Sequence, residues 1–144
     1  MLYENYLKNK HPCPFCILTK EEIIKQNKYA LITLAKAPYT KDHLLVIPKK
    51  HHVKLSSLSH DEKEGVEKLL YYGMRKLHKK YRNVTIIYRE GDLKKVGKSV
   101  LHLHYHLIPK MQIGSYDICL NKRKIYSDKE YFKKIKKVKA WLRG

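Results

Sequence analysis

Three histidines, His102, His104 and His106, occupy every second position of the stretch SVLHLHYHL, residues 99–107. Successive side chains of a β-strand point to opposite faces, so a strand here would place all three imidazoles on one face. Burying three imidazoles without partners is costly. The histidine face is therefore expected to be exposed to solvent, bound to a metal, or part of the wall of an active site.

Two cysteines, Cys13 and Cys16, enclose a Pro-Phe dipeptide near the start of the chain. Two cysteines and two histidines can form a closed, tetrahedral structural zinc site. Either His51 or His52 could supply the third ligand, and one histidine of the triplet could supply the fourth. The alternatives are two reduced thiols in a loop or a thioredoxin-like redox pair. The redox pair fits less well, because no strand precedes the cysteines to suggest a βαβ unit.

A histidine of the triplet that binds no metal could act as a nucleophile. A neutral imidazole can attack phosphorus directly and divide one difficult displacement into two easier ones. The attacking nitrogen must be unprotonated, while the other nitrogen donates its proton to a fixed acceptor and so sets the tautomer. Ser99, just upstream, would add a hydroxyl donor, and Gly97 would let the backbone approach a phosphate closely.

Four apolar segments predict the strands that position these side chains, at residues 28–35, 43–48, 84–90 and 100–108. On the last of them, the face opposite the histidines is expected to pack in the core; it consists of Leu101, Leu103, Tyr105 and Leu107. Residues 111–126 have no clear pattern and leave room for one more short strand.

Three capping boxes predict three helices. Thr19 begins a short helix over residues 19–26, and Ser59 begins the longest helix, over about residues 60–81. Ser127 begins a C-terminal helix whose apolar positions are Tyr131, Ile135, Val138 and Leu142. Together these elements predict an α+β fold, in which an antiparallel sheet is flanked by one long central helix and a C-terminal helix.

The net charge is +19, from 32 Lys and Arg against 13 Asp and Glu. Such an excess favours polyanionic partners such as nucleotides, RNA, DNA or anionic membranes. An AT-rich genome, which favours lysine and tyrosine codons, would produce the same composition without any such partner. The densest lysine cluster lies near the C-terminus, where it would serve either solvation or contact with a polyanion.

The chain of 144 residues is long enough for one domain with its own core. It has no apolar run near twenty residues and no signal peptide at its start, so we expect a cytoplasmic protein without a membrane partner. In that reducing compartment the three cysteines are not expected to form a disulfide framework.

The segment HLHYHLI, residues 102–108, resembles the signature of the histidine triad (HIT) superfamily. The resemblance covers about residues 13–110 and is specific because several motifs occur in order: Cys-x-x-Cys at 13–16, DHLLVIPKKH at 42–51, EG at 90–91 and GKSV at 97–100. It implies a single HIT-like domain over residues 1–144, with a basic C-terminal extension over about residues 111–144. Members usually form homodimers.

Members of this superfamily bind nucleotides and act as hydrolases or transferases at the α-phosphate. The resemblance implies that His104 is the nucleophile, which forms a nucleotidyl-histidine intermediate, and that His106 and His43 assist it from the same pocket. Counting without gaps from Pro48 places His51, rather than its neighbour, at a metal-ligand position. The implied ligands of one structural zinc ion per chain are Cys13, Cys16, His51 and His102.

Four positions depart from the family pattern. Ala35 stands where nucleotide-hydrolase members carry an Asp for the ribose hydroxyls, and Asp42 replaces the Gly before the first conserved histidine. Arg89 replaces an Asn and Lys98 replaces a Gln. The phosphate chemistry is therefore expected to be intact, while the part that recognises the nucleoside is altered. Arg89 and Lys98 would add positive charge near the phosphates if they face the pocket; otherwise they point to solvent.

The segment APYTKDHLLVIP, residues 37–48, is also similar to diadenosine-tetraphosphate phosphorylase-like members, which pass the nucleotidyl group to phosphate rather than to water. We therefore expect a hydrolase or nucleotidyltransferase that acts on AMP esters, phosphoramidates or dinucleoside polyphosphates. Two other classes of function remain open. One is a nucleic-acid-binding module on a HIT scaffold, and the other is a structural zinc protein with an inactive pocket.

Overall fold

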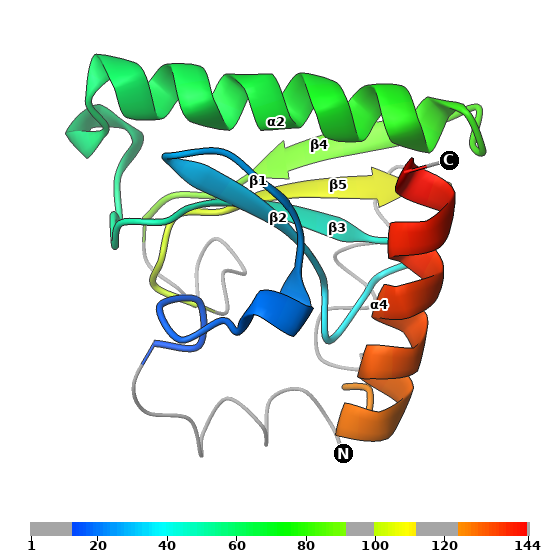
Figure 1. Ribbon diagram of the computed structural model, residues 1–144. Coiled ribbons are helices and arrows are strands. Elements are labelled where there is room, and N and C mark those ends of the chain that lie inside the picture. Colours follow the sequence, from blue (N-terminus) through cyan, green and yellow to red (C-terminus); the bar gives the residue numbers. More distant parts are fainter. Residues whose placement is uncertain (1–12, 92–99, 112–123, 144) are drawn as a thin grey trace.

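The computed structural model describes residues 13–91, 100–111 and 124–143, which form an antiparallel sheet flanked by helices (Figure 1). The sheet has five strands in the order β1-β2-β3-β5-β4. The strands are β1 (Ile23–Gln26), β2 (Ala30–Leu34), β3 (Leu44–Pro48), β4 (Val84–Tyr88) and β5 (Tyr105–Pro109). The helices are α2 (His60–His78) and α4 (Asp128–Arg143), with single 3-10 turns at η1 (Lys20–Glu22) and η2 (Leu55–Ser57). The predicted α+β class is confirmed.

Helix α2 lies across one face of the sheet (Figure 1). Its predicted capping box is present: the Ser59 hydroxyl accepts a hydrogen bond from the Glu62 backbone N–H (3.1 Å), and the Glu62 carboxylate accepts one from the Ser59 N–H (3.0 Å). A Cβ atom added to Gly73 would lie 2.5 Å from Leu107 Cδ1, so the glycine lets the helix approach β5 closely. The core between helix and sheet thus supports β5 from behind.

Helix α4 stands against one end of the sheet (Figure 1). The four apolar positions predicted for it are all buried: Tyr131, Ile135, Val138 and Leu142. The Tyr131 hydroxyl donates a hydrogen bond to the Leu34 carbonyl oxygen (2.9 Å), which joins the helix to the end of β2. The C-terminal helix is therefore an integral part of the described core.

The prediction of a helix over residues 19–26 is wrong. The capping box at Thr19 and Glu22 is present, but it begins only the turn η1, after which the chain continues as the edge strand β1. β1 pairs with β2 from Ile23 to Gln26. The two β-branched residues Ile23 and Ile24 favour this extended backbone, and pairing with β2 overrides the local helix signal.

The strand predicted over residues 100–108 is shorter than expected, because β5 begins at Tyr105. Upstream of it, the Leu103 N–H donates to the His52 carbonyl oxygen (2.6 Å), which lies outside the sheet ladder. Leu103 and Leu107 are fully buried as predicted, but Leu101 is 48% exposed and does not join the core. The alternation of a strand therefore accounts for His106 but not for all three histidines.

The remaining predicted elements agree with the structure apart from their ends. β2, β3 and β4 lie within the three other predicted strands, and α2 ends at His78 rather than near residue 81. Of the ambiguous segment 111–126, residues 112–123 lie outside the described part of the chain. Within the described residues, no helix is both long and apolar enough to cross a bilayer.

Candidate active site and metal centre

Four histidines from two separate parts of the chain gather on the sheet face opposite α2. Leu44 and Val46 of β3 pack in the core beneath α2, so Leu45 faces the other side, and His106 is its register partner on β5. The ring centroids of His104 and His106 are 4.8 Å apart, and those of His43 and His106 are 5.1 Å apart. All four rings are buried: His43, His102, His104 and His106. Of the three expectations for the histidine face, solvent exposure is excluded.

A chain of hydrogen bonds orders the protons on His43 and His106. The Tyr39 backbone N–H donates to His43 Nδ1 (3.2 Å), so this nitrogen is an acceptor and the ring proton of neutral His43 is on Nε2. His43 Nε2 lies 2.9 Å from His106 Nδ1 and donates to it. His106 therefore carries its proton on Nε2, which makes that atom a hydrogen-bond donor.

His104 has the opposite tautomer. Its Nδ1 lies 2.7 Å from the His102 carbonyl oxygen, and because a carbonyl can only accept, Nδ1 carries the proton. Neutral His104 then has its lone pair on Nε2. This is the tautomer that a nucleophilic imidazole needs, and the carbonyl would also stabilise the positive charge that develops on the ring during attack.

His102 turns its lone pair in another direction. Its Nε2 donates to the Pro48 carbonyl oxygen (2.9 Å), so the lone pair of the neutral ring is on Nδ1. That atom lies 3.5 Å from both Cys13 Sγ and Cys16 Sγ. A backbone carbonyl that fixes the far nitrogen of a histidine is a common arrangement around metal ligands.

The four predicted metal ligands come together as one group. One donor atom each from Cys13, Cys16, His51 and His102 lies within 4.8 Å of every other, and His51 Nδ1 is 3.2 Å from Cys16 Sγ. Zinc bonds of about 2.0–2.3 Å in a tetrahedron separate the ligand atoms by about 3.6 Å. The donor types, their number and their spacing therefore fit a structural zinc ion. Burial and the neighbouring Cys13 raise the pKa of the Cys16 thiol. The thiolate that binds a metal is therefore costly to form, and a bound cation would offset this cost.

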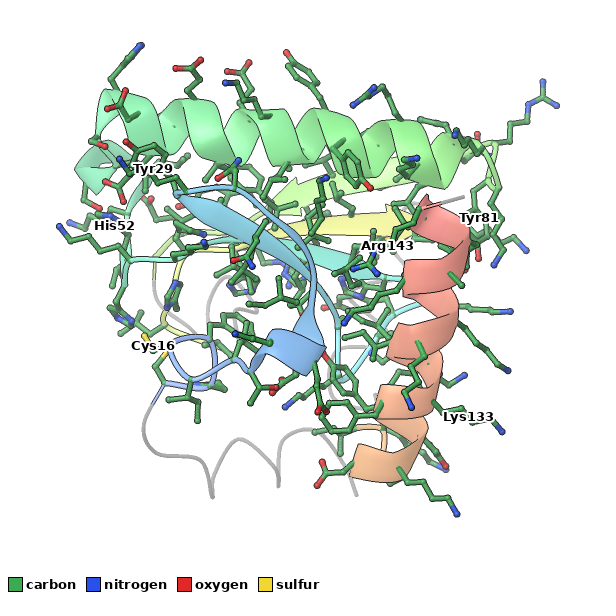
Figure 2. The ribbon with its side chains drawn as sticks, in the orientation of Figure 1. Cys16, Tyr29, His52, Tyr81, Lys133 and Arg143 are labelled. Atoms are coloured by element: carbon green, nitrogen blue, oxygen red, sulfur yellow. The ribbon has the colours of Figure 1, made fainter. Side chains whose placement is uncertain are left out.

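His52, the alternative third ligand, is not part of this group. Its Nε2 lies 2.6 Å from Glu62 Oε2 and its Nδ1 lies 2.9 Å from the Ser57 hydroxyl. Figure 2 shows His52 beside the start of α2, away from Cys16. Counting without gaps from Pro48 thus selects the histidine of the adjacent pair that the structure places beside the two cysteines.

The loop that carries Cys13 and Cys16 also contacts the histidine cluster. Cys16 N–H donates to the Cys13 carbonyl oxygen (3.2 Å), and this turn brings Phe15 against His104, with ring centroids 5.0 Å apart. Phe15 had no predicted role in the sequence. Its position between the two cysteines could have indicated this contact, because two ligands of one ion restrict the conformation of the residues between them.

A hollow beside the histidines has a volume of about 630 Å³ when its open mouth is included. His43, His104 and His106 form one side of it, and apolar residues such as Phe15 and Leu18 form another. Among the described residues that line it, none is an aspartate or glutamate. A pocket with apolar walls and a few convergent polar groups is typical of small-ligand sites.

Arg89 and Ala35 both line this hollow. Of the two expectations for Arg89, facing the pocket or pointing to solvent, the first is therefore the one observed. The Arg89 guanidinium lies 3.3 Å from the Tyr39 hydroxyl and donates to it. The Tyr39 ring in turn stacks on His43, at 5.6 Å between centroids. Tyr39, which contacts His43, and Tyr131 of α4, which lines the hollow, had no predicted role at the site. The predicted phosphate-site residues Gly97, Lys98 and Ser99 lie outside the described part of the chain.

Asp42, which replaces a family glycine, has a positive φ of 64°. Aspartate is among the few residues other than glycine that tolerate this left-handed backbone. Its buried carboxylate accepts hydrogen bonds from the Lys80 ammonium (2.9 Å) and from the Tyr81 hydroxyl. The substitution therefore preserves the turn before His43 and ties it to the end of α2.

The fold and the arrangement of its histidines define a histidine triad domain. The family profile described as the HIT domain matches residues 19–113, and the chain belongs to this family. A HIT-like protein of 16.1 kDa from Mycoplasma pneumoniae is 31% identical over 78% of this chain and 80% of its own length. The adenosine 5'-monophosphoramidase of Schizosaccharomyces pombe is 31% identical over 68% of this chain and 74% of its own length.

Two solved structures share the fold. The diadenosine triphosphate hydrolase of Plasmodium falciparum superposes with a TM-score of 0.71 and 21% identity, over 94% of this chain and 88% of that one. A zinc-bound histidine triad family protein from Mycobacterium smegmatis superposes with a TM-score of 0.60 and 21% identity, over 96% and 92% of the two chains. At these identities the likeness extends to the fold alone.

Proposed function

We propose that this protein is a nucleotide hydrolase or nucleotidyltransferase that acts at the α-phosphate of nucleotide conjugates. The substrates would be AMP esters, phosphoramidates or dinucleoside polyphosphates. One observation carries the proposal: hydrogen bonds to backbone groups give His104 and His106 opposite tautomers. A nucleophilic lone pair and a hydrogen-bond donor are thereby offered to one phosphate from neighbouring rings, 4.8 Å apart.

The first step would be attack of His104 Nε2 on the α-phosphorus. A P–N bond forms, the P–O or P–N bond to the leaving group breaks, and the leaving group departs with the bonding electron pair and takes up a proton from water. His106 Nε2–H donates a hydrogen bond to a phosphate oxygen, while the His102 carbonyl stabilises the proton on His104 Nδ1. An acceptor then attacks the same phosphorus, and His104 leaves.

The electrostatics of the hollow support an anionic substrate. Arg89 contributes a permanent positive charge to its wall, and the described lining residues contribute no carboxylate. Gly97, Lys98 and Ser99 are proposed to complete the phosphate site, as the family resemblance implies. The relatives named above, which include an adenosine 5'-monophosphoramidase, support a nucleotide as the substrate class.

The test is turnover by the wild type and by His104→Gly with adenosine phosphoramidate, an AMP ester and a diadenosine polyphosphate, and mass detection of a nucleotidyl adduct on the protein. Wild type is expected to react, and His104→Gly is expected to lose activity by several orders of magnitude and to form no adduct. His60→Ala, a change of an exposed histidine, serves as the control. If wild type neither turns over these substrates nor forms an adduct, the proposed activity is wrong.

The second candidate function is transfer of the nucleotidyl group to phosphate, as in a dinucleoside polyphosphate phosphorylase. The segment 37–48, which contains Tyr39 and His43, motivates it. With a diadenosine polyphosphate as substrate, added inorganic phosphate would then shift the product from AMP to ADP. Nucleotide analysis with and without phosphate distinguishes the two acceptors, and a product that stays AMP contradicts the transferase.

We further propose that Cys13, Cys16, His51 and His102 hold a structural zinc ion. All four positions are supplied by protein atoms, which would leave the ion no open position for chemistry. Its contribution would be to hold the loop that carries Phe15 against His104 and to position the backbone of His102. Metal analysis of the purified protein tests this assignment.

A homodimer, which the family resemblance implies, is a further proposal about assembly. Light scattering at several protein concentrations tests it. A mass near twice 17.2 kDa supports the dimer, and a mass near 17.2 kDa at all concentrations contradicts it.

A further inference from the structure

A second recess lies between α4 and the loop that leads into β3, apart from the histidines. Measured in the same way as the hollow at the histidines, with its open mouth included, it has a volume of about 640 Å³. Four lysines and two aromatic residues dominate its lining: Lys41, Lys80, Lys134, Lys137, Tyr126 and Trp141. The hollow at the active site and this recess share the lining residue Leu34, but none of the histidines lines the recess.

The recess is built with residues beyond the region that defines the family. The HIT match ends at residue 113, whereas Tyr126, Lys134, Lys137 and Trp141 come from α4 and the segment before it. The other lysines belong to the domain itself, Lys41 just before His43 and Lys80 just after α2. The C-terminal extension therefore creates a concave basic surface on the domain.

Most of the positive charge in the recess is not neutralised by protein groups. Asp42 is the one carboxylate among the lining residues, and it already accepts hydrogen bonds from Lys80 and Tyr81. In the described part of the chain, Lys41, Lys134 and Lys137 form no ion pair. Lysines gathered in one concavity repel each other, and an anionic ligand would relieve that repulsion.

Two of the ammonium groups lie against the aromatic rings. Lys80 Nζ is 4.9 Å from the centroid of the Trp141 ring, and Lys134 Nζ is 5.1 Å from that of Tyr126. A phosphate that draws these lysines toward itself would uncover ring faces on which a base can stack. Lysines interleaved with aromatic rings are typical of sites for single strands, where phosphates meet cations and bases meet rings.

We propose that this recess binds single-stranded nucleic acid, with its lysines on the backbone phosphates and its rings against the bases. The proposal is independent of the activity assigned to His104, because none of the histidines lines the recess. It gives part of the net charge of +19 a specific location and a ligand. A free polyphosphate shares the charge of such a strand but lacks its bases.

The test uses Trp141, the only tryptophan of the chain, as a fluorescent reporter. Wild type is titrated with a ten-nucleotide single strand, with an abasic strand of the same length and with tripolyphosphate. We expect the base-containing strand to change Trp141 fluorescence and to bind at least fivefold more tightly than the other two ligands. Stacking of one base is worth about 1–3 kcal/mol, which is a factor of about five or more.

The decisive comparison is between two double variants of α4 with equal loss of charge. Lys134→Gln with Lys137→Gln removes lysines of the recess, and Lys133→Gln with Lys136→Gln removes exposed lysines outside its lining. Figure 2 shows Lys133 directed away from the domain. The first pair is expected to weaken binding about tenfold and to lower the slope of log affinity against log salt by about 1.4, while the control changes affinity less than twofold.

Three outcomes would overturn the proposal. Equal weakening by both double variants would show that the charge acts diffusely over the surface. Binding of tripolyphosphate as tight as that of the base-containing strand would show a site for free phosphate chains. Binding of the strand without any change in Trp141 fluorescence would place it elsewhere on the protein. A melting curve of the first double variant, compared with that of wild type, serves as a check that the domain is folded.

Discussion

His43 Nε2 and His106 Nδ1 lie 2.9 Å apart in the interior of the protein, although 63 residues separate them in sequence. The Tyr39 backbone N–H occupies the other nitrogen of His43, so the proton of neutral His43 must lie between the two rings. A backbone group that cannot titrate thus determines which nitrogen of neutral His106 carries the proton. In the proposed mechanism, His43 positions His106 through this hydrogen bond.

Replacing His43 with Ala should therefore reduce turnover without abolishing it. Loss of the hydrogen bond lets His106 adopt either tautomer and weakens its donation to a phosphate oxygen, so we expect kcat to fall about 10- to 100-fold, far less than in His104→Gly. Steady-state hydrolysis of adenosine phosphoramidate measures this. A kcat within twofold of wild type would contradict the role, as would a change confined to KM. A melting curve of the variant checks that the domain stays folded.

His51 and His52 offer a matched pair for testing the metal centre. His51 lies beside Cys16 Sγ, whereas His52 lies against Glu62. We expect wild type to purify with one zinc per chain and His51→Ala to lose most of it, while His52→Ala retains the metal. Elemental analysis of the three proteins measures the zinc content.

Removal of zinc should also lower stability, because binding to the folded chain alone adds to its free energy of unfolding. A strong chelator is expected to lower the Tm of wild type by several degrees and to leave that of His51→Ala nearly unchanged. If chelation does not shift the Tm of wild type, these four residues do not form a structural zinc site.

The order of the elements could be predicted from the sequence because most signals were local. Capping boxes, apolar periodicity and proline positions located α2, α4 and three of the strands. Two predictions failed where long-range pairing outweighed a local signal. Residues 23–26 pair with β2 and form a strand instead of a helix. The Leu103 N–H bonds to the His52 carbonyl oxygen, and residues 100–104 lie outside β5.

The site was predictable to the extent that it repeats a family motif. The metal ligands and the histidines of the pocket were named from sequence, and the structure brings them together. The contacts of Phe15, Tyr39 and Tyr131 could not be predicted, because they depend on how distant segments approach the pocket. The tautomers depend on backbone N–H and carbonyl groups, which a sequence does not place.

The contact between His52 and Glu62 predicts a pH dependence of stability. Hydrogen bonds from Ser59 and His52 lower the pKa of Glu62 below its ordinary value of 4.5, despite partial burial. Because the pKa of Glu62 is lower in the folded than in the unfolded state, the carboxylate stabilises the fold to its full extent at pH values above the unfolded-state pKa. This stabilisation is lost as the pH falls through the folded-state value.

Glu62→Gln removes this titration while keeping a side chain that can complete the capping box. We expect wild type to be more stable than Glu62→Gln at pH 7, with a constant difference down to about pH 5.5 that shrinks below pH 4.5. Urea unfolding at a series of pH values measures the difference. Glu64→Gln, on the exposed side of α2, is the control and should show a much smaller effect. A difference that grows toward acid pH would contradict the assignment.

Arg89 should contribute mainly to substrate binding. It lines the hollow and is held by the Tyr39 hydroxyl, so its charge is positioned before a substrate arrives. Arg89→Gln is expected to raise KM for a diadenosine polyphosphate about tenfold and to raise it less for adenosine phosphoramidate, which carries less negative charge. Steady-state kinetics with both substrates tests this, and an equal effect on the two would argue against contact with the phosphate chain.

The alanine at position 35 leads us to expect that the enzyme accepts substrates with and without the ribose hydroxyls. It stands where nucleotide-hydrolase members place an aspartate for the ribose hydroxyls, and no other carboxylate occurs among the described residues of the hollow. A site built to bind a hydroxyl rejects analogues that lack it, because its polar groups are then left unpaired, whereas a site without such groups loses little. Wild type should therefore use adenosine and 2',3'-dideoxyadenosine phosphoramidates with kcat/KM values within about threefold of each other.

Ala35→Asp should create a preference for the ribonucleoside, and Ala35→Asn provides a control of similar size without the charge. The variants test whether position 35 contacts the sugar. The comparison of the two substrates with wild type remains informative even if a larger side chain at this buried position impairs folding. The measurement is the ratio of kcat/KM for the two phosphoramidates. A wild-type preference for ribose above about tenfold would show that another group binds the hydroxyls and that Ala35 does not define the sugar site.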